Sequence, residues 1–205
     1  HYVVEENGTC FQLVHETYRA WHAGESNWAG NDDINSCSIG IELCNPGHDW
    51  GYRKFPEQQM KTLISLCRDV ITRNSIPSHL VLGHSDIAPH RKMDPGEKFD
   101  WEFLASHQIG LWLKEREKKS ELVNEFKEDD DSITLPIRTA QVNLKEIGYS
   151  VNVNGKFDEI TKKVVIAFQR HFCPKNLSGT LDKETFSLIT LYSEIASKRA
   201  FPRKR

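Results

Sequence analysis

An abrupt change of composition at residues 114–132 constrains the fold of this chain more than any other feature of its sequence. Charged residues dominate the segment, including a run of mixed sign at 114–119 and an acidic run at 128–131. Such a composition is typical of an exposed helix or a solvated linker, because the segment has little apolar surface to bury. The sequence therefore predicts two small domains, residues 1–113 and 133–205, joined by a charged linker and with little packing between them.

Two patterns near the start of the chain predict strands. The pair Asn7-Gly8 separates two short apolar runs, which indicates a β-hairpin with a type I′ turn. Residues 38–43 alternate between apolar side chains and small or polar ones. This alternation puts Gly40 and Glu42 on the same face of a strand, so that the carboxylate projects from the face that the glycine leaves uncovered. These strands predict a central β-sheet.

A helix and a further strand complete a predicted α/β domain, in which a mixed central β-sheet is flanked by helices. Apolar side chains recur at helical spacing over residues 56–74, with a proline suited to the first turn. The run 79–82 is short and mostly apolar, which favours a buried strand. Because loops at strand ends commonly carry function, the residues after this run are candidates for chemistry.

Those residues include side chains that can bind a metal. His84 follows the apolar run closely, and Asp94 lies in the same proline-rich loop. Neutral imidazole and carboxylate are good zinc ligands, and a catalytic zinc usually has three protein ligands and a water. A histidine and an aspartate at this spacing also occur by chance in many soluble proteins, so the spacing by itself favours ordinary loop residues.

Four separated segments together resemble a known enzyme family. They are residues 21–24, 35–43, 83–89 and 92–96. In their order and approximate spacing they are similar to the zinc-dependent N-acetylmuramoyl-L-alanine amidases of the bacterial type-2 family, which are related in fold to phage T7-type lysozyme and to peptidoglycan recognition proteins. The resemblance covers about residues 1–113. It implies hydrolysis of the amide bond between N-acetylmuramic acid and L-alanine in peptidoglycan or muropeptides, with Zn²⁺ as the cofactor.

The resemblance also implies roles for individual residues. His84 and Asp94 match the second and third zinc ligands of the family, Glu42 matches its catalytic carboxylate, and Lys92 matches its catalytic lysine. Family members carry their first zinc-ligand histidine on a strand that precedes the segment beginning at His1. We therefore expect the first ligand upstream of His1. His1 itself matches a histidine that opens the next strand, where it has no metal role.

The remaining expectations concern the substrate. Trp21 and His22 are expected to line the groove for sugar and peptide, although a Trp-His pair in a loop is as often used for packing. Asn35 is expected to contact the substrate as well. In an amidase, Glu42 would take a proton from the attacking water and pass it to the leaving amine, and Lys92 would face the negative charge that develops on the carbonyl oxygen.

The second domain is predicted to be a small three-helix all-α domain. Amphipathic segments lie at 137–147, 160–168 and 186–191, and Asp158 and Asp182 stand at plausible N-caps of the second and third helices. The placement of the turn glycines just before the helix starts is similar to that in the peptidoglycan-binding type-1 module. The alternative is a helical bundle without this binding function.

Composition limits the partners. The formal net charge of −2 argues against a nucleic-acid partner, and no apolar run approaches the length of a membrane span. The expected partner is peptidoglycan or a muropeptide, and no feature predicts the oligomeric state. We expect a protein of the bacterial cell envelope, in the periplasm or associated with the outer membrane, with a cytoplasmic location as the alternative. The five cysteines show no metal-type spacing and are expected to be reduced and mostly buried.

Two other functions compete with the zinc amidase. A non-catalytic peptidoglycan-binding protein is the first, because one ligand of the family is not in the sequence. The second is a thiol amidase that uses Cys44 with His48, but nothing around this pair gives a reason for a depressed thiol pKa. Zinc at one equivalent in the purified protein would favour the zinc amidase over both alternatives.

Overall fold

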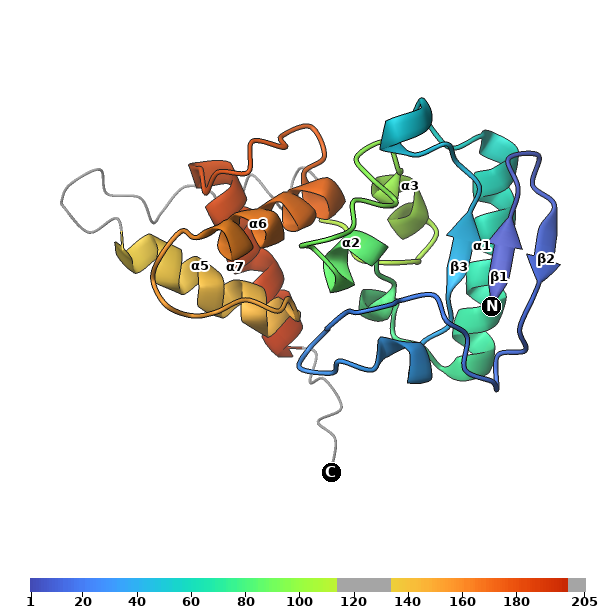
Figure 1. Ribbon diagram of the computed structural model, residues 1–205, viewed down its shortest axis with the longest axis horizontal. Helices are drawn as coiled ribbons and strands as arrows, with labels where there is room; N and C mark the ends of the chain where they lie inside the picture. The colour runs from blue at the N-terminus through green and yellow to red at the C-terminus, as the bar shows by residue number, and fades with distance from the viewer. Residues whose placement is uncertain (114–133, 199–205) are drawn as a thin grey trace.

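The computed structural model describes residues 1–113 and 134–198, so the predicted linker lies outside the described residues and the domain boundaries remain a prediction. A small sheet and helix α1 stand at one end of the molecule, helices α5, α6 and α7 stand at the other, and α2 and α3 lie between them (Figure 1). This is the predicted architecture, an α/β part with a mixed sheet followed by three helices.

The sheet has three short strands: β1 (Tyr2–Val4), β2 (Cys10–Gln12) and β3 (Ile41–Leu43). Their order is β2-β1-β3. β1 pairs with β2 antiparallel and with β3 parallel, and Val3 lies opposite Glu42 in the parallel pair. The predicted mixed sheet is therefore confirmed, and β2 and β3 are its edge strands among the described residues.

The hairpin between β1 and β2 is confirmed, but the predicted type I′ turn is wrong. The amide of Glu5 donates to the carbonyl of Thr9 at 2.9 Å, and the amide of Gly8 donates to the carbonyl of Glu5 at 2.9 Å. Gly8 has a φ of 87°, whereas Asn7 does not have a positive φ. This is a longer turn that ends in a left-handed glycine, and the Thr62 hydroxyl of α1 donates to the Gly8 carbonyl at 2.9 Å.

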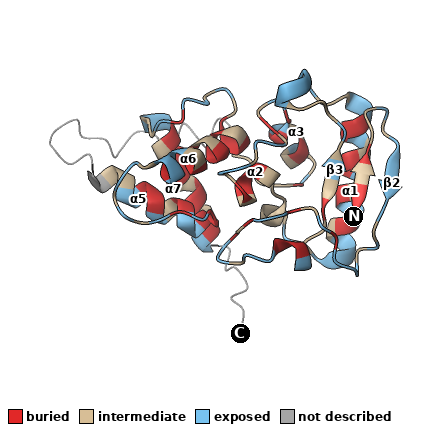
Figure 2. Cartoon of the chain, in the orientation of Figure 1, coloured by how far each residue is buried: buried red, intermediate tan, exposed pale blue. Residues whose placement is uncertain are grey.

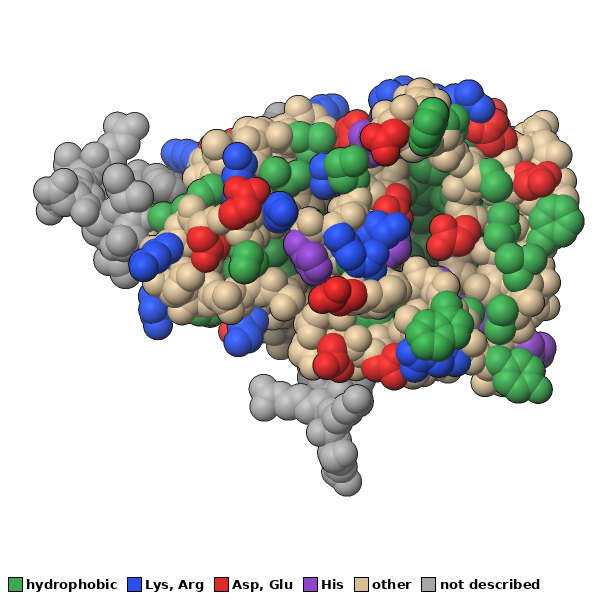
Figure 3. Space-filling model, in the orientation of Figure 1, with side chains coloured by type: hydrophobic (Ala, Val, Ile, Leu, Met, Phe, Trp, Pro, Cys, Tyr) green, Lys and Arg blue, Asp and Glu red, His purple; other side chains and the backbone are tan. Residues whose placement is uncertain are grey.

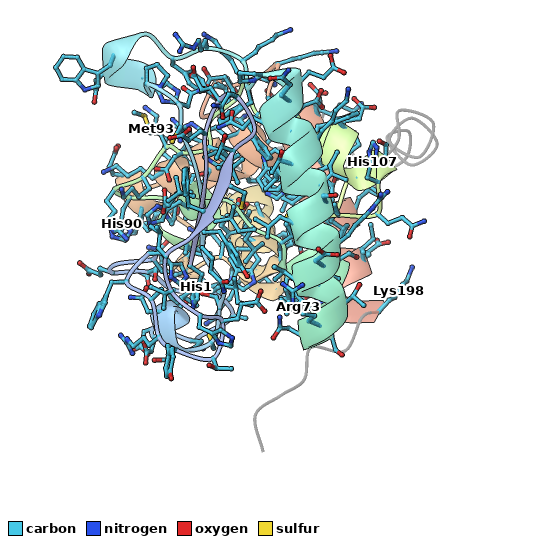
Figure 4. All side chains as sticks on the ribbon, turned by 90° about the vertical axis from the view of Figure 1, so that its right-hand side faces the viewer. His1, Arg73, His90, Met93, His107 and Lys198 are labelled. Carbon is cyan, nitrogen blue, oxygen red and sulfur yellow. The ribbon has the colours of Figure 1, made fainter. Side chains whose placement is uncertain are left out.

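Helix α1 (Glu57–Asn74) confirms the helix predicted over 56–74 and packs against the sheet. In Figure 4 it runs beside the strands, with His1 at the sheet and Arg73 near the end of the helix. Its buried Gln59 donates from Nε2 to the carbonyls of Val4 and Cys44, both at 2.9 Å. One side chain thus ties the helix to the ends of β1 and β3.

The buried strand predicted at 79–82 is wrong. Ser78–Leu80 form a short 3₁₀ helix, and Val81 is extended without a neighbouring strand among the described residues. Val81 and Leu82 are only half-buried. An extended segment becomes a strand only when a neighbour accepts and donates its backbone hydrogen bonds, which the local sequence does not determine. Helix α2 (His84–Ile87) follows, and α3 (Trp101–Ser106) lies further along.

Two further 3₁₀ helices, Ile34–Ser36 and His48–Trp50, complete the first part of the chain. No helix in the described residues is both long enough and apolar enough to cross a membrane.

The three predicted helices of the second part are confirmed as α5 (Thr134–Ile147), α6 (Glu159–Phe172) and α7 (Lys183–Lys198). Both predicted N-caps form. Asp158 accepts from the amide of Thr161 at 2.8 Å, and Asp182 accepts from the amide of Thr185 at 2.8 Å. Each cap satisfies a backbone donor of the first helical turn, which fixes where α6 and α7 begin.

The turns that precede α6 and α7 are built alike around a fully buried glutamine. Gln141 of α5 accepts from the amide of Gly155 at 2.8 Å, and Gln169 of α6 accepts from the amide of Gly179 at 2.9 Å. Both glycines have a positive φ, 73° and 66°. A side chain with a Cβ would be strained there, which explains the regular placement of the turn glycines.

The expectation of little packing between the two parts is wrong. A single hydrophobic cluster joins Ala23, Trp28 and Ile34 of the first part to residues of α5, α6 and α7, including Phe168 and Tyr192. Figure 2 shows the buried residues continuing from one half of the molecule to the other. A charged linker allows two domains to be independent, but it does not prevent them from packing together. Here the apolar side chains of Ala23, Trp28 and Ile34 pack the first part against the helices.

The cysteine prediction is correct in one respect and wrong in the other. All five cysteines are free, and Cys67 and Cys173 are buried. Cys10, Cys37 and Cys44 are exposed, however. Cys10 stands on β2, an edge strand whose residues are all exposed, and short edge strands offer little cover to a side chain.

Candidate active site

A groove of about 740 Å³ opens between β3 and the segment that leads into α2. The space-filling view shows a hollow between the sheet side and the α2 side of the molecule (Figure 3). Although they come from separate parts of the sequence, six of the predicted site residues line it: Trp21, His22, Glu42, His84, Lys92 and Asp94. The fold thus brings the predicted metal-binding and catalytic residues to one surface.

His84 and Asp94 face each other across the loop. Nδ1 of His84 lies 2.9 Å from Oδ2 of Asp94, and Nε2 of His84 lies 3.0 Å from the carbonyl of Ala23. The amide of Ser85 donates to the Asp94 carbonyl at 2.9 Å, which holds the two ends of the loop together. An imidazole and a carboxylate at this distance are residue types that suit a divalent cation, and the Ala23 carbonyl is the type of partner that orients a ligand histidine.

Charges around Asp94 keep it ionised. Burial acts to raise the pKa of Asp94, but the hydrogen bond and charge of His84, together with the charge of Lys92, outweigh burial and lower it. A carboxylate in this form is ready to bind a cation without first losing a proton.

The two residues do not form a complete metal site by themselves. Within the residues that the structure describes, no group of three His, Cys, Asp or Glu side chains converges. His1 is buried at the sheet, where its Nδ1 accepts from the amide of Gly40 at 3.0 Å and its Nε2 lies 3.0 Å from the Tyr18 carbonyl. These contacts give His1 a structural role at the sheet, and the expectation that it does not bind the metal remains a prediction.

Glu42 projects from β3 into the groove, on the same face as Gly40. The expectation that this face is uncovered at Gly40 is wrong, because the ring of His22 lies against Gly40 and fills the space. His22 is held by Ser38 Oγ, 2.8 Å from its Nε2, and by the Ala20 carbonyl, 3.0 Å from its Nδ1. Burial lowers the pKa of His22. The groove beside Glu42 is therefore walled by a positioned imidazole.

The two other predicted substrate residues occupy different environments. Trp21 is 83% exposed at the rim of the groove, and the Arg19 guanidinium stacks over its ring at 4.5 Å. Asn35 is buried, and its Oδ1 accepts from the amides of His22 and Ala23 at 3.0 and 2.8 Å. These bonds position the loop that carries His22, and a direct contact of Asn35 with substrate remains a prediction.

The structure also shows a buried residue beside the site that sequence reasoning missed. Asp86, in the same short helix as His84, is 1% exposed and accepts from Tyr149 and His171 of the second part. Its partners are 63 and 85 residues away in the sequence. No local pattern marks such a contact.

The pair proposed for a thiol amidase is not assembled as a dyad. Nε2 of His48 lies 3.0 Å from Oε2 of Glu97, and its ring packs on Tyr52 at 4.2 Å. Cys44 is exposed. His48 is therefore engaged with a carboxylate and a phenol, and this arrangement offers no support for the thiol mechanism.

Comparison with known proteins identifies the family of the chain. Residues 1–97 match the family model described as N-acetylmuramoyl-L-alanine amidase, and residues 135–189 match that of a putative peptidoglycan binding domain. A solved structure of Escherichia coli AmiD, a complex with anhydro-N-acetylmuramic acid-L-Ala-D-gamma-Glu-L-Lys, superposes with a TM-score of 0.81 at 32% identity, covering 98% of this chain and 79% of that one. The chain belongs to the N-acetylmuramoyl-L-alanine amidase family.

Other comparisons agree with this amidase family. The crystal structure of AmpDH3 from Pseudomonas aeruginosa matches with a TM-score of 0.80 at 30% identity over 95% of this chain and 81% of that one. In sequence, the chain is 38% identical over 182 residues to N-acetylmuramoyl-L-alanine amidase AmiD of Escherichia coli (strain K12), covering 85% of this chain. The chain spans 63% of the length of that curated relative.

Proposed function

We propose that this protein is a zinc-dependent amidase that hydrolyses the bond between N-acetylmuramic acid and L-alanine in peptidoglycan or muropeptides. The observation that carries the proposal is the convergence of the His84–Asp94 pair with Glu42 and Lys92 on one groove. The relatives with solved structures support it, because one of them is a complex with an anhydro-muramyl peptide.

The residues of the groove suit the steps of amide hydrolysis. A bound zinc would supply a Lewis acid and lower the pKa of a nearby water. His84 and Asp94 would hold the ion. Glu42 then accepts a proton from the attacking water and delivers it to the leaving nitrogen, and the Lys92 ammonium faces the negative charge on the carbonyl oxygen. The exposed ring of Trp21 offers a flat apolar face to a sugar.

The shape of the groove supports the expectation of a further strand. β3 is an edge strand, and the extended Val81 lines the same groove without a paired strand among the described residues. Ile41, Leu43 and Leu82 line the groove and are only half-buried. A strand laid beside β3 would cover these side chains and pair its free edge. We propose that this is the strand that the resemblance places upstream of His1, with the first zinc ligand.

We also propose a cell-envelope role, because a peptidoglycan binding domain accompanies the amidase domain. A cytoplasmic enzyme that acts on released muropeptides is the alternative. Fractionation of the source bacterium with an antibody against the protein separates the two locations.

The enzymatic proposal is tested on the natural-length protein by metal analysis and by chromatography of an anhydro-muropeptide digest. We expect about one zinc per chain and release of the peptide from the sugar. His84→Ala and Asp94→Ala should each abolish zinc binding and hydrolysis. His90→Ala is the matched control, since His90 is exposed in the same loop (Figure 4) and is not among the residues that line the groove.

Each outcome bears on a different part of the proposal. Full zinc occupancy in His84→Ala would contradict the ligand assignment. Zinc without any hydrolysis in the unmodified protein would favour the non-catalytic peptidoglycan-binding alternative.

A further inference from the structure

Asp86 is the point at which the second part of the chain meets the predicted metal site. Its Oδ1 accepts from the hydroxyl of Tyr149 at 2.7 Å, and its Oδ2 accepts from Nδ1 of His171 at 2.8 Å. Tyr149 is 1% exposed and His171 is 2% exposed. A buried carboxylate must find its hydrogen-bond donors within the protein. Two donors to Asp86 come from the helical part.

The surroundings hold these donors in place. The ring of His171 is stacked between Trp101 of α3, at 3.8 Å, and Phe172, at 4.0 Å. Burial and the Asp86 carboxylate raise the pKa of Tyr149 well above its ordinary range, so its hydroxyl remains a donor. The contact therefore has little freedom to rearrange.

The same carboxylate organises the start of α2. Oδ2 of Asp86 accepts from the amide of Gly83 at 2.7 Å, which caps the short helix that begins at His84. The amide of Ser85 is in turn bonded to the Asp94 carbonyl at 2.9 Å. A short helix has few hydrogen bonds of its own, so its direction depends on this cap and on its packing. Figure 1 shows α2 between α6 and the rest of the first part.

A second contact between the two parts involves the loop that supplies the other hydrogen-bond partner of His84, the Ala23 carbonyl. The carbonyl of Gly148 accepts from the amide of Ala29 at 2.8 Å, and the ring of Trp28 packs edge-on against Tyr149 at 5.0 Å. This loop also contains Ala23, whose carbonyl lies 3.0 Å from Nε2 of His84. The loop that orients the imidazole is therefore tied to the second part of the chain at Trp28 and Ala29.

We propose that the C-terminal helical part is a structural component of the amidase site: Tyr149 and His171 are positioning residues that act through Asp86 to hold His84 and Asp94 in the geometry that binds the metal. The inference rests on the proposed function. It differs from a module that only tethers the enzyme to the wall, because a tether raises the local concentration of substrate and leaves the site itself unchanged.

The test uses Tyr149→Phe in the natural-length protein. This change removes one hydroxyl, the donor to Asp86, and keeps the ring. Thr185→Val is the matched control, because it removes a buried hydroxyl that accepts from Gln169 at 3.0 Å within the helical part. His171→Phe is the second variant, since it removes the other donor and retains a ring for the stack on Trp101.

Two quantities are measured at a temperature where every variant is folded: zinc affinity by chelator competition, and hydrogen exchange of the backbone amides of residues 83–86. We expect Tyr149→Phe to weaken zinc binding about fivefold, the lower end for coupled sites, and to speed exchange at Gly83 and Ser85. His171→Phe should act in the same direction. Thr185→Val should change neither quantity, although it removes a comparable hydrogen bond.

The inference is overturned if Tyr149→Phe and His171→Phe leave zinc affinity and exchange at 83–86 unchanged in a protein that binds zinc and hydrolyses its substrate. Equal effects of Thr185→Val would also overturn it, because general loosening of the helices would then be the cause. If the unmodified protein binds no zinc, the proposed function fails, and the exchange comparison still decides whether the helices hold α2.

Discussion

Gly40→Ala perturbs the groove at one defined contact. A Cβ at Gly40 would lie 2.5 Å from Cδ2 and 2.7 Å from Cβ of His22. These separations are too short for real carbon contacts, so the imidazole must move. It would then lose its contact with Ser38 Oγ, now 2.8 Å from Nε2, beside Glu42 in the groove.

The magnitude follows from two opposing effects. Overpacking of a filled site costs about 1–3 kcal/mol in the free energy of unfolding. Gly40 does not have a positive φ, so its backbone suits alanine. In a background without the His22 side chain, the same substitution should therefore stabilise the protein by about 0.4–1 kcal/mol, because alanine restricts the unfolded chain. The effect of one methyl group changes sign with the presence of the His22 side chain.

The assay is a double-mutant cycle of Gly40→Ala and His22→Gly, followed by thermal or denaturant unfolding. We expect Gly40→Ala alone to lower Tm by about 4–8 °C for a destabilisation of about 2 kcal/mol in a chain of this length. The double variant should be no less stable than His22→Gly. If Gly40→Ala destabilises both backgrounds equally, the imidazole does not fill this space and the described wall of the groove is wrong.

Three other perturbations address the catalytic carboxylate, the pH dependence and the contact between the two parts. Glu42→Gln should retain zinc and lower turnover of a muropeptide about a hundredfold or more, the usual scale for a general base; undiminished turnover would make Glu42 a structural residue. The hydrogen bond from Arg73 lowers the pKa of Glu16 to about 2, so this pair contributes stability above the ordinary glutamate pKa that is lost as the pH falls towards 2. After discounting for the exposure of Arg73, we expect about 1 kcal/mol at pH 7, and Arg73→Ala should remove both that stability and its acid titration in unfolding curves taken from pH 7 to 2. Gly148→Ala would place a Cβ 2.5 Å from Cε2 of Trp28 at a φ of 133° and should destabilise the folded protein by about 3 kcal/mol; a loss below 0.5 kcal/mol in denaturant unfolding would show that Trp28 can move aside.

Features that depend on neighbours in the chain could be predicted from the sequence. Helical spacing predicted α1, α5, α6 and α7, because an apolar stripe at this period can be buried only by a helix. Asp158 and Asp182 predicted where α6 and α7 begin, since a cap needs only the next three residues. The four motif segments also predicted six of the residues that line the groove, because the order of these segments along the chain resembles that of a known family.

Features that depend on residues far apart in the chain could be read only from the fold. Val81 and Leu82 have the composition of a strand, but they lack a neighbour to pair with among the described residues. The charged linker predicted two independent domains, whereas Trp28 and its neighbours join one hydrophobic cluster with the helices. Asp86 lies in a short polar segment, yet two of its hydrogen-bond donors, Tyr149 and His171, lie in the second part of the chain. In each case the energy comes from a contact between segments that the chain brings together only on folding, and no local pattern records which segment will supply the partner.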